Sequence, residues 1–77
     1  MKIKVIYLAR SSEDIGKKEE YVEILDPNPT IKHLFLRLDL DKINYKIYTA
    51  KNLEHANFEM KLEENDEIAF FPTITGG

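Results

Sequence analysis

Residues 31–38 carry the apolar pattern that most restricts how this chain can fold. Apolar side chains recur there at positions i, i+3, i+4 and i+7, which places them on one face of a helix. The residues of this face are Ile31, Leu34, Phe35 and Leu38. Thr30 is well placed to cap the start of the helix. Because a helix with one apolar face must bury that face, we expect it to lie across a sheet.

A proline-rich turn separates this helix from the segment before it. Residues 26–29 read Asp-Pro-Asn-Pro, and proline cannot continue a strand ladder because it has no backbone N–H. Residues 20–25 contain strand-forming side chains, but either of their two faces could point inward. We prefer Val22 and Ile24 as the inward pair over the alternative, Tyr21 and Leu25.

Alternating side chains predict the other strands. Residues 1–8 alternate lysine with aliphatic or aromatic residues, and the expected inward face is Ile3, Val5 and Tyr7. Tyr45 and Ile47 begin a third alternating segment, and residues 50–60 should hold a turn and a short strand. The last strand is predicted over residues 67–71, where Ile68 and Phe70 share one face.

Short turns are predicted between these elements. Ser11 is expected to start one helical turn and Gly16 to end it. Glu64-Asn65-Asp66 should form a tight turn before the last strand, because asparagine tolerates the left-handed conformation. Pro72 is expected to end the pairing of that strand.

The order strand, strand, helix, strand, strand predicts an α+β fold. A chain of 77 residues that are 43% hydrophobic has apolar material for one small core. We therefore expect a mixed sheet with the helix packed on one face. A right-handed crossover would place the first and last strands side by side and parallel.

Several kinds of chemistry are excluded or unsupported by the residues. The chain has no cysteine, so it can form no thiol nucleophile, redox pair or cysteine-ligated zinc site. His33 lies off the apolar helix face, and neither it nor His55 has a second ligand at metal spacing. No glycine-rich phosphate loop is present. We expect no cofactor or metal on this chain.

The formal net charge of −3 and the lack of a basic cluster disfavour nucleic acid as a partner. Acidic residues gather between Glu54 and Glu67; they can form a solvated face or attract a basic partner, and the sequence leaves both open. Residues 1–8 lack the continuous apolar run of a signal peptide, and no segment approaches the length of a membrane span. We expect a soluble protein of the cytoplasm.

The chain ends in Gly76-Gly77. A frayed terminus is one reading, but two residues without a Cβ can also pass extended through a channel too narrow for side chains. The terminal carboxylate is then the reachable group. A carboxylate is a poor electrophile, so its reaction requires prior activation, for example as an adenylate formed by a partner enzyme with Mg-ATP.

Residues 62–77, Leu-Glu-Glu-Asn-Asp-Glu-Ile-Ala-Phe-Phe-Pro-Thr-Ile-Thr-Gly-Gly, resemble the end of molybdopterin synthase small subunits. That family typically has a turn with Gly-Asp, a strand with Phe-Phe-Pro-Pro, and a final Ser-Gly-Gly. This chain departs from the pattern at Asn65, Thr73 and Thr75, where the family has glycine, proline and serine. Asparagine at position 65 can still adopt the left-handed conformation that the turn requires. Thr73 and Thr75 change the stiffness of the tail and the position of a hydroxyl group.

The resemblance implies a ubiquitin-like β-grasp domain over residues 1–72 and a flexible tail over residues 73–77. It further implies that an E1-like enzyme adenylates Gly77, that a sulfur donor converts it to a thiocarboxylate, and that the tail enters a larger catalytic subunit. The sulfur would then pass to cyclic pyranopterin monophosphate, for molybdenum or tungsten cofactor. On this reading the chain is a sulfur-donor subunit and not an enzyme by itself.

The site residues implied by the resemblance fall at the C-terminus. Gly76 and Gly77 would carry the chemistry, and the preceding residues would bind partners: Phe71, Pro72, Thr73, Ile74 and Thr75. We expect Phe71 to be exposed on the sheet face opposite the helix, although coverage by the chain's own loops is an alternative. Ile74 has no core to join and is expected to anchor the tail against a partner.

Three other functions fit the same ending. A sulfur carrier for thiazole synthesis shares the fold and the two glycines but usually lacks the Phe-Phe-Pro segment. A small protein modifier would be ligated to lysines through Gly77. A plain interaction module would use no terminal chemistry at all.

Overall fold

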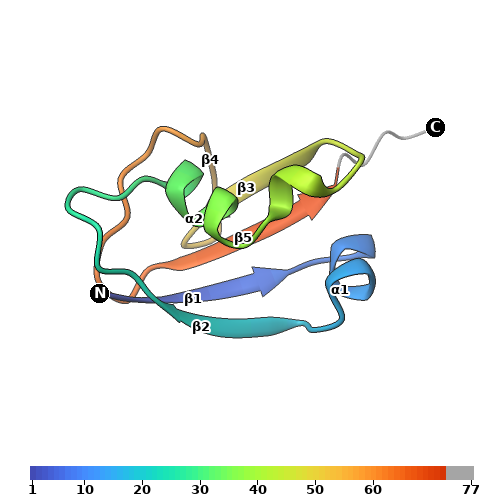
Figure 1. Cartoon of the computed structure of the whole chain (residues 1–77), viewed down its shortest axis with the longest axis horizontal. Coiled ribbons are helices and arrows are strands. Elements are labelled where there is room, and N and C mark those ends of the chain that lie inside the picture. Colours follow the sequence, from blue (N-terminus) through green and yellow to red (C-terminus); the bar gives the residue numbers. More distant parts are fainter. Residues whose placement is uncertain (73–77) are drawn as a thin grey trace.

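A mixed five-stranded sheet forms the centre of the protein, with strand order β2-β1-β5-β3-β4 (Figure 1). The computed structural model describes residues 1–72. The strands are β1 (Lys2–Tyr7), β2 (Glu19–Glu23), β3 (Ile47–Lys51), β4 (Glu54–Ala56) and β5 (Glu67–Pro72). The helices are α1 (Arg10–Ile15), α2 (Ile31–Arg37) and the 3-10 turn η1 (Leu40–Lys42). β1 and β5 are parallel neighbours, as the crossover rule predicts, and the other pairs are antiparallel.

One face of the sheet packs against α2 and forms the core (Figure 1). The predicted inward residues of β1 are all buried, as are Val22 and Ile24, while Tyr21 and Leu25 are exposed. Ile68 and Phe70 of β5 are fully buried. Within the described residues no helix is long and apolar enough to cross a membrane.

α2 begins where the sequence predicts, and its cap uses two residues. The hydroxyl of Thr30 accepts a hydrogen bond from the backbone N–H of His33, and the Thr30 N–H donates to His33 Nδ1 at 2.9 Å. This reciprocal arrangement satisfies two of the backbone donors that a helix start leaves unpaired. His33 is exposed as expected, but its role in the cap is one that the sequence analysis missed.

The prediction that Ser11 starts the first helix is wrong. α1 begins at Arg10, and Ala9 precedes it with a positive φ of 54° and no side-chain cap. Ser11 is instead fully buried, and its hydroxyl lies between two carbonyl oxygens, that of Leu8 at 2.5 Å and that of Phe70 at 3.2 Å. The serine therefore ties α1 to β5. Gly16 ends the helix in the left-handed conformation, with φ 87°, as predicted.

Two strand boundaries near the C-terminus also differ from the predictions. β3 begins at Ile47 and not at Tyr45, whose hydroxyl donates to Asp14 of α1 at 2.7 Å. β5 includes Pro72, which lies opposite Ile47, so its pairing runs one residue further than predicted. Proline lacks only the N–H and keeps an extended φ, so it can be the last residue of a strand.

The turn before β5 has the expected left-handed asparagine, with φ 68° at Asn65. The next residue, Asp66, is buried and accepts hydrogen bonds from the N–H of Glu63 at 2.8 Å and from Asn52 Nδ2 at 3.0 Å. Lys51 Nζ lies 3.4 Å from the second carboxylate oxygen of Asp66. This network attaches the turn to the β3–β4 hairpin and fixes where β5 starts.

Candidate functional site at the end of β5

β5 is the last strand before the two terminal glycines in the sequence. It lies between β1 and β3, so Phe70 has Tyr7 as its neighbour on one side and Thr49 on the other. Both flanking residues are buried. A central strand of this kind is fixed by main-chain bonds on both edges. The position from which the last residues of the sequence depart is therefore set by the core.

Phe71 is the last aromatic residue before the end of the described chain. It lies on the sheet face opposite α2, with the Tyr48 ring centroid at 6.2 Å and the His55 ring centroid at 6.1 Å. The prediction that Phe71 is exposed is wrong, because these two side chains cover part of the ring and leave it half-buried. The exposed part of the ring lies on the side of the sheet that faces away from the core.

The neighbours of Phe71 are functional candidates that the sequence analysis did not find. Tyr48 lies directly opposite Phe71 in the β3–β5 register, and His55 reaches it from β4 on the outer edge of the sheet. Aromatic cross-strand pairs of this kind stabilise a sheet face. The β3–β5 register places Tyr48 beside Phe71, the β3–β4 register brings His55 to the same face, and the sequence carries no signal that fixes either register.

The remaining predicted site residues lie at or beyond the end of the described chain. Pro72 closes β5 opposite Ile47. Thr73, Ile74, Thr75, Gly76 and Gly77 lie outside the described residues. The predictions that residues 73–77 form a flexible tail and that Gly77 carries the chemistry therefore stay predictions.

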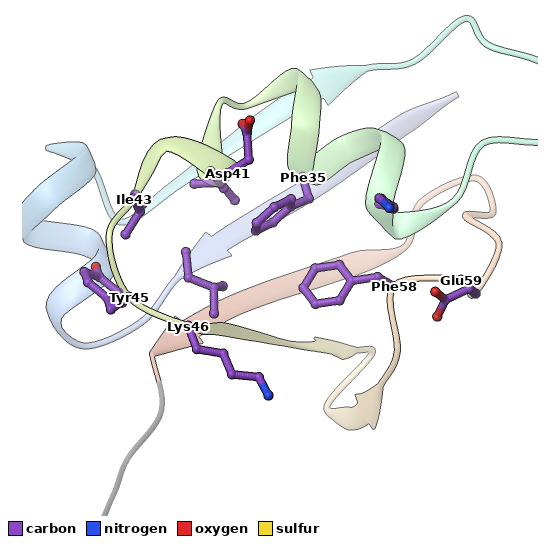
Figure 2. Close-up of a pocket in the computed structure, with 10 residues that line it drawn as sticks. Phe35, Asp41, Ile43, Tyr45, Lys46, Phe58 and Glu59 are labelled. Atoms are coloured by element: carbon purple, nitrogen blue, oxygen red, sulfur yellow. The ribbon is translucent and has the colours of Figure 1, made fainter.

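A hollow of about 470 Å³ lies on the α2 side of the sheet (Figure 2). We call it the α2–β3 hollow; its apolar and aromatic wall is Phe35, Leu40, Ile43, Tyr45, Ile47 and Phe58. Figure 2 shows the rings of Phe35 and Phe58 directed toward one another, and their centroids are 5.0 Å apart in an edge-to-face arrangement. Charged side chains such as Asp41 and Lys46 stand at its rim.

Two tyrosine hydroxyls are bonded to carboxylates near the end of β5. The hydroxyl of Tyr7 donates to Glu20 at 2.6 Å, and that of Tyr45 donates to Asp14. Burial, reinforced by the hydrogen bond to Glu20, raises the pKa of Tyr7 well above its usual range. Desolvation and the bond to Asp14 raise the pKa of Tyr45 in the same way. Both groups are uncharged at neutral pH and act as structural ties.

The acidic residues between Glu54 and Glu67 divide into two groups. Asp66 and Glu63 contact Lys51, and the hydrogen bond to Glu63 raises the pKa of that lysine. These two acids have a structural role, as does Glu64, whose carboxylate accepts a hydrogen bond from the Lys2 N–H at 2.7 Å. Glu67 is half-buried at the start of β5, and the exposed Glu54 and Glu59 remain for solvent or a partner. Among residues 1–72 no group of three histidine, aspartate or glutamate side chains is arranged to hold a metal ion.

The strand order, the single covering helix and the parallel β1–β5 pair at the centre of the sheet define a ubiquitin-like protein of the β-grasp class. The chain belongs to the ThiS family, whose family model matches residues 5–77. It is 32% identical, over 82 aligned positions, to the molybdopterin synthase sulfur carrier subunit of Escherichia coli K12. That alignment covers 97% of this chain and 99% of the E. coli protein.

Solved structures share the fold over the whole chain. SAMP1 from Haloferax volcanii matches with a TM-score of 0.81 and 22% identity, covering 100% of both chains. A chain in the complex of subunits 1 and 2 of the molybdopterin-converting factor from Helicobacter pylori 26695 matches with a TM-score of 0.70 and 20% identity, again covering 100% of both chains. At these identities the structures establish the β-grasp architecture.

Proposed function

We propose that this chain is the sulfur-carrier subunit of a molybdopterin synthase. The observation that carries the proposal is the 32% identity with the E. coli sulfur carrier subunit along nearly the full length of both proteins. The Gly76-Gly77 ending and the central position of β5 support it, because a rigid strand presents a narrow tail with a terminal carboxylate.

The proposed cycle takes place at the Gly77 carboxylate. A carboxylate oxygen attacks the α-phosphorus of ATP in an E1-like enzyme that holds Mg-ATP, and pyrophosphate leaves. A sulfide-level sulfur donor then attacks the carbonyl carbon of the adenylate, AMP leaves, and the thiocarboxylate forms. Its sulfur passes to cyclic pyranopterin monophosphate, and water restores the carboxylate. This chain supplies the carrier group, and its partners supply the catalytic groups.

The proposed partner is a larger catalytic subunit that receives the tail. The H. pylori structure named above is a complex of two subunits of a molybdopterin-converting factor, which supports a two-subunit assembly here. The half-buried ring of Phe71 can offer apolar contact beside the departing chain. We propose that Pro72, Thr73, Ile74 and Thr75 line the channel of that subunit together with Phe71, and that neither nucleic acid nor a membrane takes part.

The test is to incubate the pure protein with host extract, Mg-ATP and a sulfur source, and then to alkylate it with iodoacetamide. Because the chain has no cysteine, it offers no competing thiol. Alkylation also separates sulfur incorporation from oxidation of Met1 or Met60, which changes the mass by nearly the same amount. We expect one label per chain, located on Gly77 and dependent on ATP.

Two matched samples control this experiment. A variant that ends at Gly76 keeps the whole β-grasp domain and should take no label, whereas Lys2→Arg should label like the parent chain. Absence of label with activating partners shown to be working on the E. coli carrier would contradict the proposal. Label on Gly76 of the shortened variant would show that the partner does not select the terminal diglycine.

A protein modifier is the second candidate, and the likeness to SAMP1 favours it over the others because a second solved structure of the same fold is the small archaeal modifier protein 1 of H. volcanii. Both functions begin with the same activated carboxylate. Lysine-linked conjugates in the host that disappear on deletion of Gly77 would favour modification. Co-purification with a larger subunit, without conjugates, would favour the carrier.

A further inference from the structure

The imidazole of His33 has a place in the cap of α2 that only its neutral form can fill. The backbone N–H of Thr30 donates to His33 Nδ1 at 2.9 Å. A ring nitrogen that accepts a hydrogen bond carries no proton, so the proton of the neutral ring is on Nε2. The side chain is exposed, and it therefore exchanges protons with solvent.

The other backbone donors at the start of α2 are held by the segment beside it, residues 58–62. The Ile31 N–H donates to the carbonyl of Met60 at 2.9 Å. The Lys32 N–H donates to the carbonyl of Phe58, also at 2.9 Å. Phe58 is in turn part of the wall of the α2–β3 hollow. The first turn of α2, residues 58–62 and this side of the hollow are therefore held together by one set of hydrogen bonds.

Protonation of His33 removes its bond to Thr30, and no rotation of the ring restores that bond. In the imidazolium both ring nitrogens are donors, so the Thr30 N–H would face a second donor. The added positive charge would also lie at the N-terminus of the helix, where the helix dipole disfavours it. The unfolded chain has neither contact. The stability gained from this bond is therefore present at neutral pH and is lost as pH falls past about 6.5, where a free histidine takes up a proton.

The charged side chains around His33 do not compensate for a positive charge on its ring. Within residues 1–72, none of the ion pairs includes His33. The charged residues on the neighbouring elements come from α2 itself, from the turn before it and from residues 58–62; they are Lys32, Arg37, Asp26, Glu59 and Lys61. Three of these five groups are basic, so they do not favour a further positive charge.

We propose that His33 makes the start of α2 a pH-sensitive cap. Its protonation breaks the bond to Thr30, loosens residues 58–62 against the first turn of the helix, and opens the wall of the α2–β3 hollow at Phe58. Acid then acts on the helix side of the sheet, whereas the network around Asp66 at the start of β5 keeps its contacts. The device belongs to this chain alone and stands whether or not sulfur transfer is its function.

The test is an NMR titration of the full-length chain between about pH 8 and 5, on either side of the range of free histidine. We expect the Thr30 amide proton to move upfield, because it loses its acceptor, with the same midpoint as the His33 ring signals. The ring signals of Phe58 should shift with that midpoint. Amide-exchange protection at Ile31 and Lys32, corrected for the intrinsic effect of pH, should fall about fivefold, the size expected for the loss of one helix cap.

Variants of the two histidines isolate the ring that acts. His33→Gln keeps a side-chain acceptor at the third helical position, so it should retain the protection and lose the titration. His33→Ala should lower the protection at every pH. His55→Gln is the matched control, because His55 lies against Phe71 on the opposite face of the sheet, and it should leave the Thr30 titration unchanged.

Three results would overturn the proposal. A Thr30 signal that stays fixed while the His33 ring titrates would show that the ring is not its acceptor. A Thr30 titration that persists in His33→Gln would assign the effect to another group, such as Asp26 or Glu59. Signals of Phe58 that stay fixed while Thr30 titrates would confine the effect to the cap and remove its link to the hollow.

Discussion

The two ends of β5 are held by different kinds of contact. At its start, polar groups converge on the buried Asp66 carboxylate, which accepts hydrogen bonds from the Glu63 N–H and the Asn52 amide and forms an ion pair with Lys51 at 3.4 Å. At its end, aromatic rings dominate, with Phe71 beside Tyr48 and His55 on one face. The difference teaches how a small domain can hold one strand in two ways: directional hydrogen bonds fix β5 at its start, and less directional aromatic packing surrounds its end.

Removing the carboxylate at the start of β5 should have the largest effect on stability. Asp66→Ala leaves the Glu63 N–H and the Asn52 amide without their acceptor and removes one of the two carboxylates beside Lys51, which should lower the free energy of unfolding by about 2–3 kcal/mol. Asp66→Asn keeps the shape of the side chain and one acceptor oxygen, so its free energy of unfolding should lie between those of the parent chain and of Asp66→Ala. Urea denaturation measures both. A loss below about 1 kcal/mol for Asp66→Ala would show that this network does not anchor the strand.

Truncating the aromatic side chain at the end of β5 should cost less stability. Phe71 is half-buried, so Phe71→Ala should lower the free energy of unfolding by about 1–2 kcal/mol, below the range for a fully buried phenylalanine. On the proposed function it should also weaken binding to the larger subunit. Tyr21→Ala, on the same sheet face but at the far edge in β2, is the matched control for calorimetric titration. Equal losses of affinity in the two variants would remove Phe71 from the proposed interface.

The β3–β4 hairpin, which contacts the start of β5, has a strained backbone conformation at Leu53. Leu53 is 90% exposed and has a φ of 72°, a conformation that disfavours side chains with a Cβ. Leu53→Gly should raise the free energy of unfolding by about 0.5–1 kcal/mol, after allowance for the greater freedom of glycine in the unfolded chain. Leu25→Gly, at an exposed leucine without positive φ, should lower it. A lower free energy of unfolding in both glycine variants would contradict the backbone strain at Leu53.

Alkaline pH should reduce the stability that the protein gains from the Tyr7 hydroxyl, which lies near the end of β5 and donates a hydrogen bond to Glu20. The pKa of Tyr7 is raised in the folded protein, by burial first and then by the bond to Glu20. Above the pKa of a free tyrosine, about 10, the unfolded chain loses this proton while the folded chain keeps it. Stability therefore falls as pH rises past that point.

Tyr7→Phe isolates this contribution, because Tyr45 and Lys51 titrate alike in both proteins. We expect the parent chain to be the more stable at pH 7 and its advantage to shrink between about pH 10 and 11. An advantage that stays constant with pH would mean that Tyr7 is not buried in its neutral form.

Most of the fold follows from local sequence patterns, and the failures share one physical cause. The alternation in β1 and β5, the stripe of α2 and the turn at Asn65 each depend on neighbouring residues alone, and all three predictions are confirmed. Ser11, Tyr45 and Phe71 depart from their predictions because distant residues decide their surroundings. The Ser11 hydroxyl lies 3.2 Å from the Phe70 carbonyl oxygen, the Tyr45 hydroxyl donates to Asp14, and the ring of Phe71 packs against Tyr48 and His55.

The candidate site divides in the same way. The diglycine ending and the Phe-Phe-Pro segment are contiguous, so the sequence alone points to the C-terminus. The aromatic neighbours of Phe71 and the α2–β3 hollow depend on the register of β3 against β5 and on the packing of α2. No single segment encodes these features, and they emerge only once the sheet is assembled.

The measurement that tests the sulfur-carrier account most directly follows the sulfur through one turnover. The thiocarboxylated chain is mixed with the larger subunit and cyclic pyranopterin monophosphate, and the mass of this chain is read before and after. The account predicts that each chain loses one sulfur, regains a free carboxylate at Gly77 and yields a sulfur-containing pterin in proportion. A thiocarboxylate that persists beside an active larger subunit, or a chain that becomes linked to lysine, would contradict it.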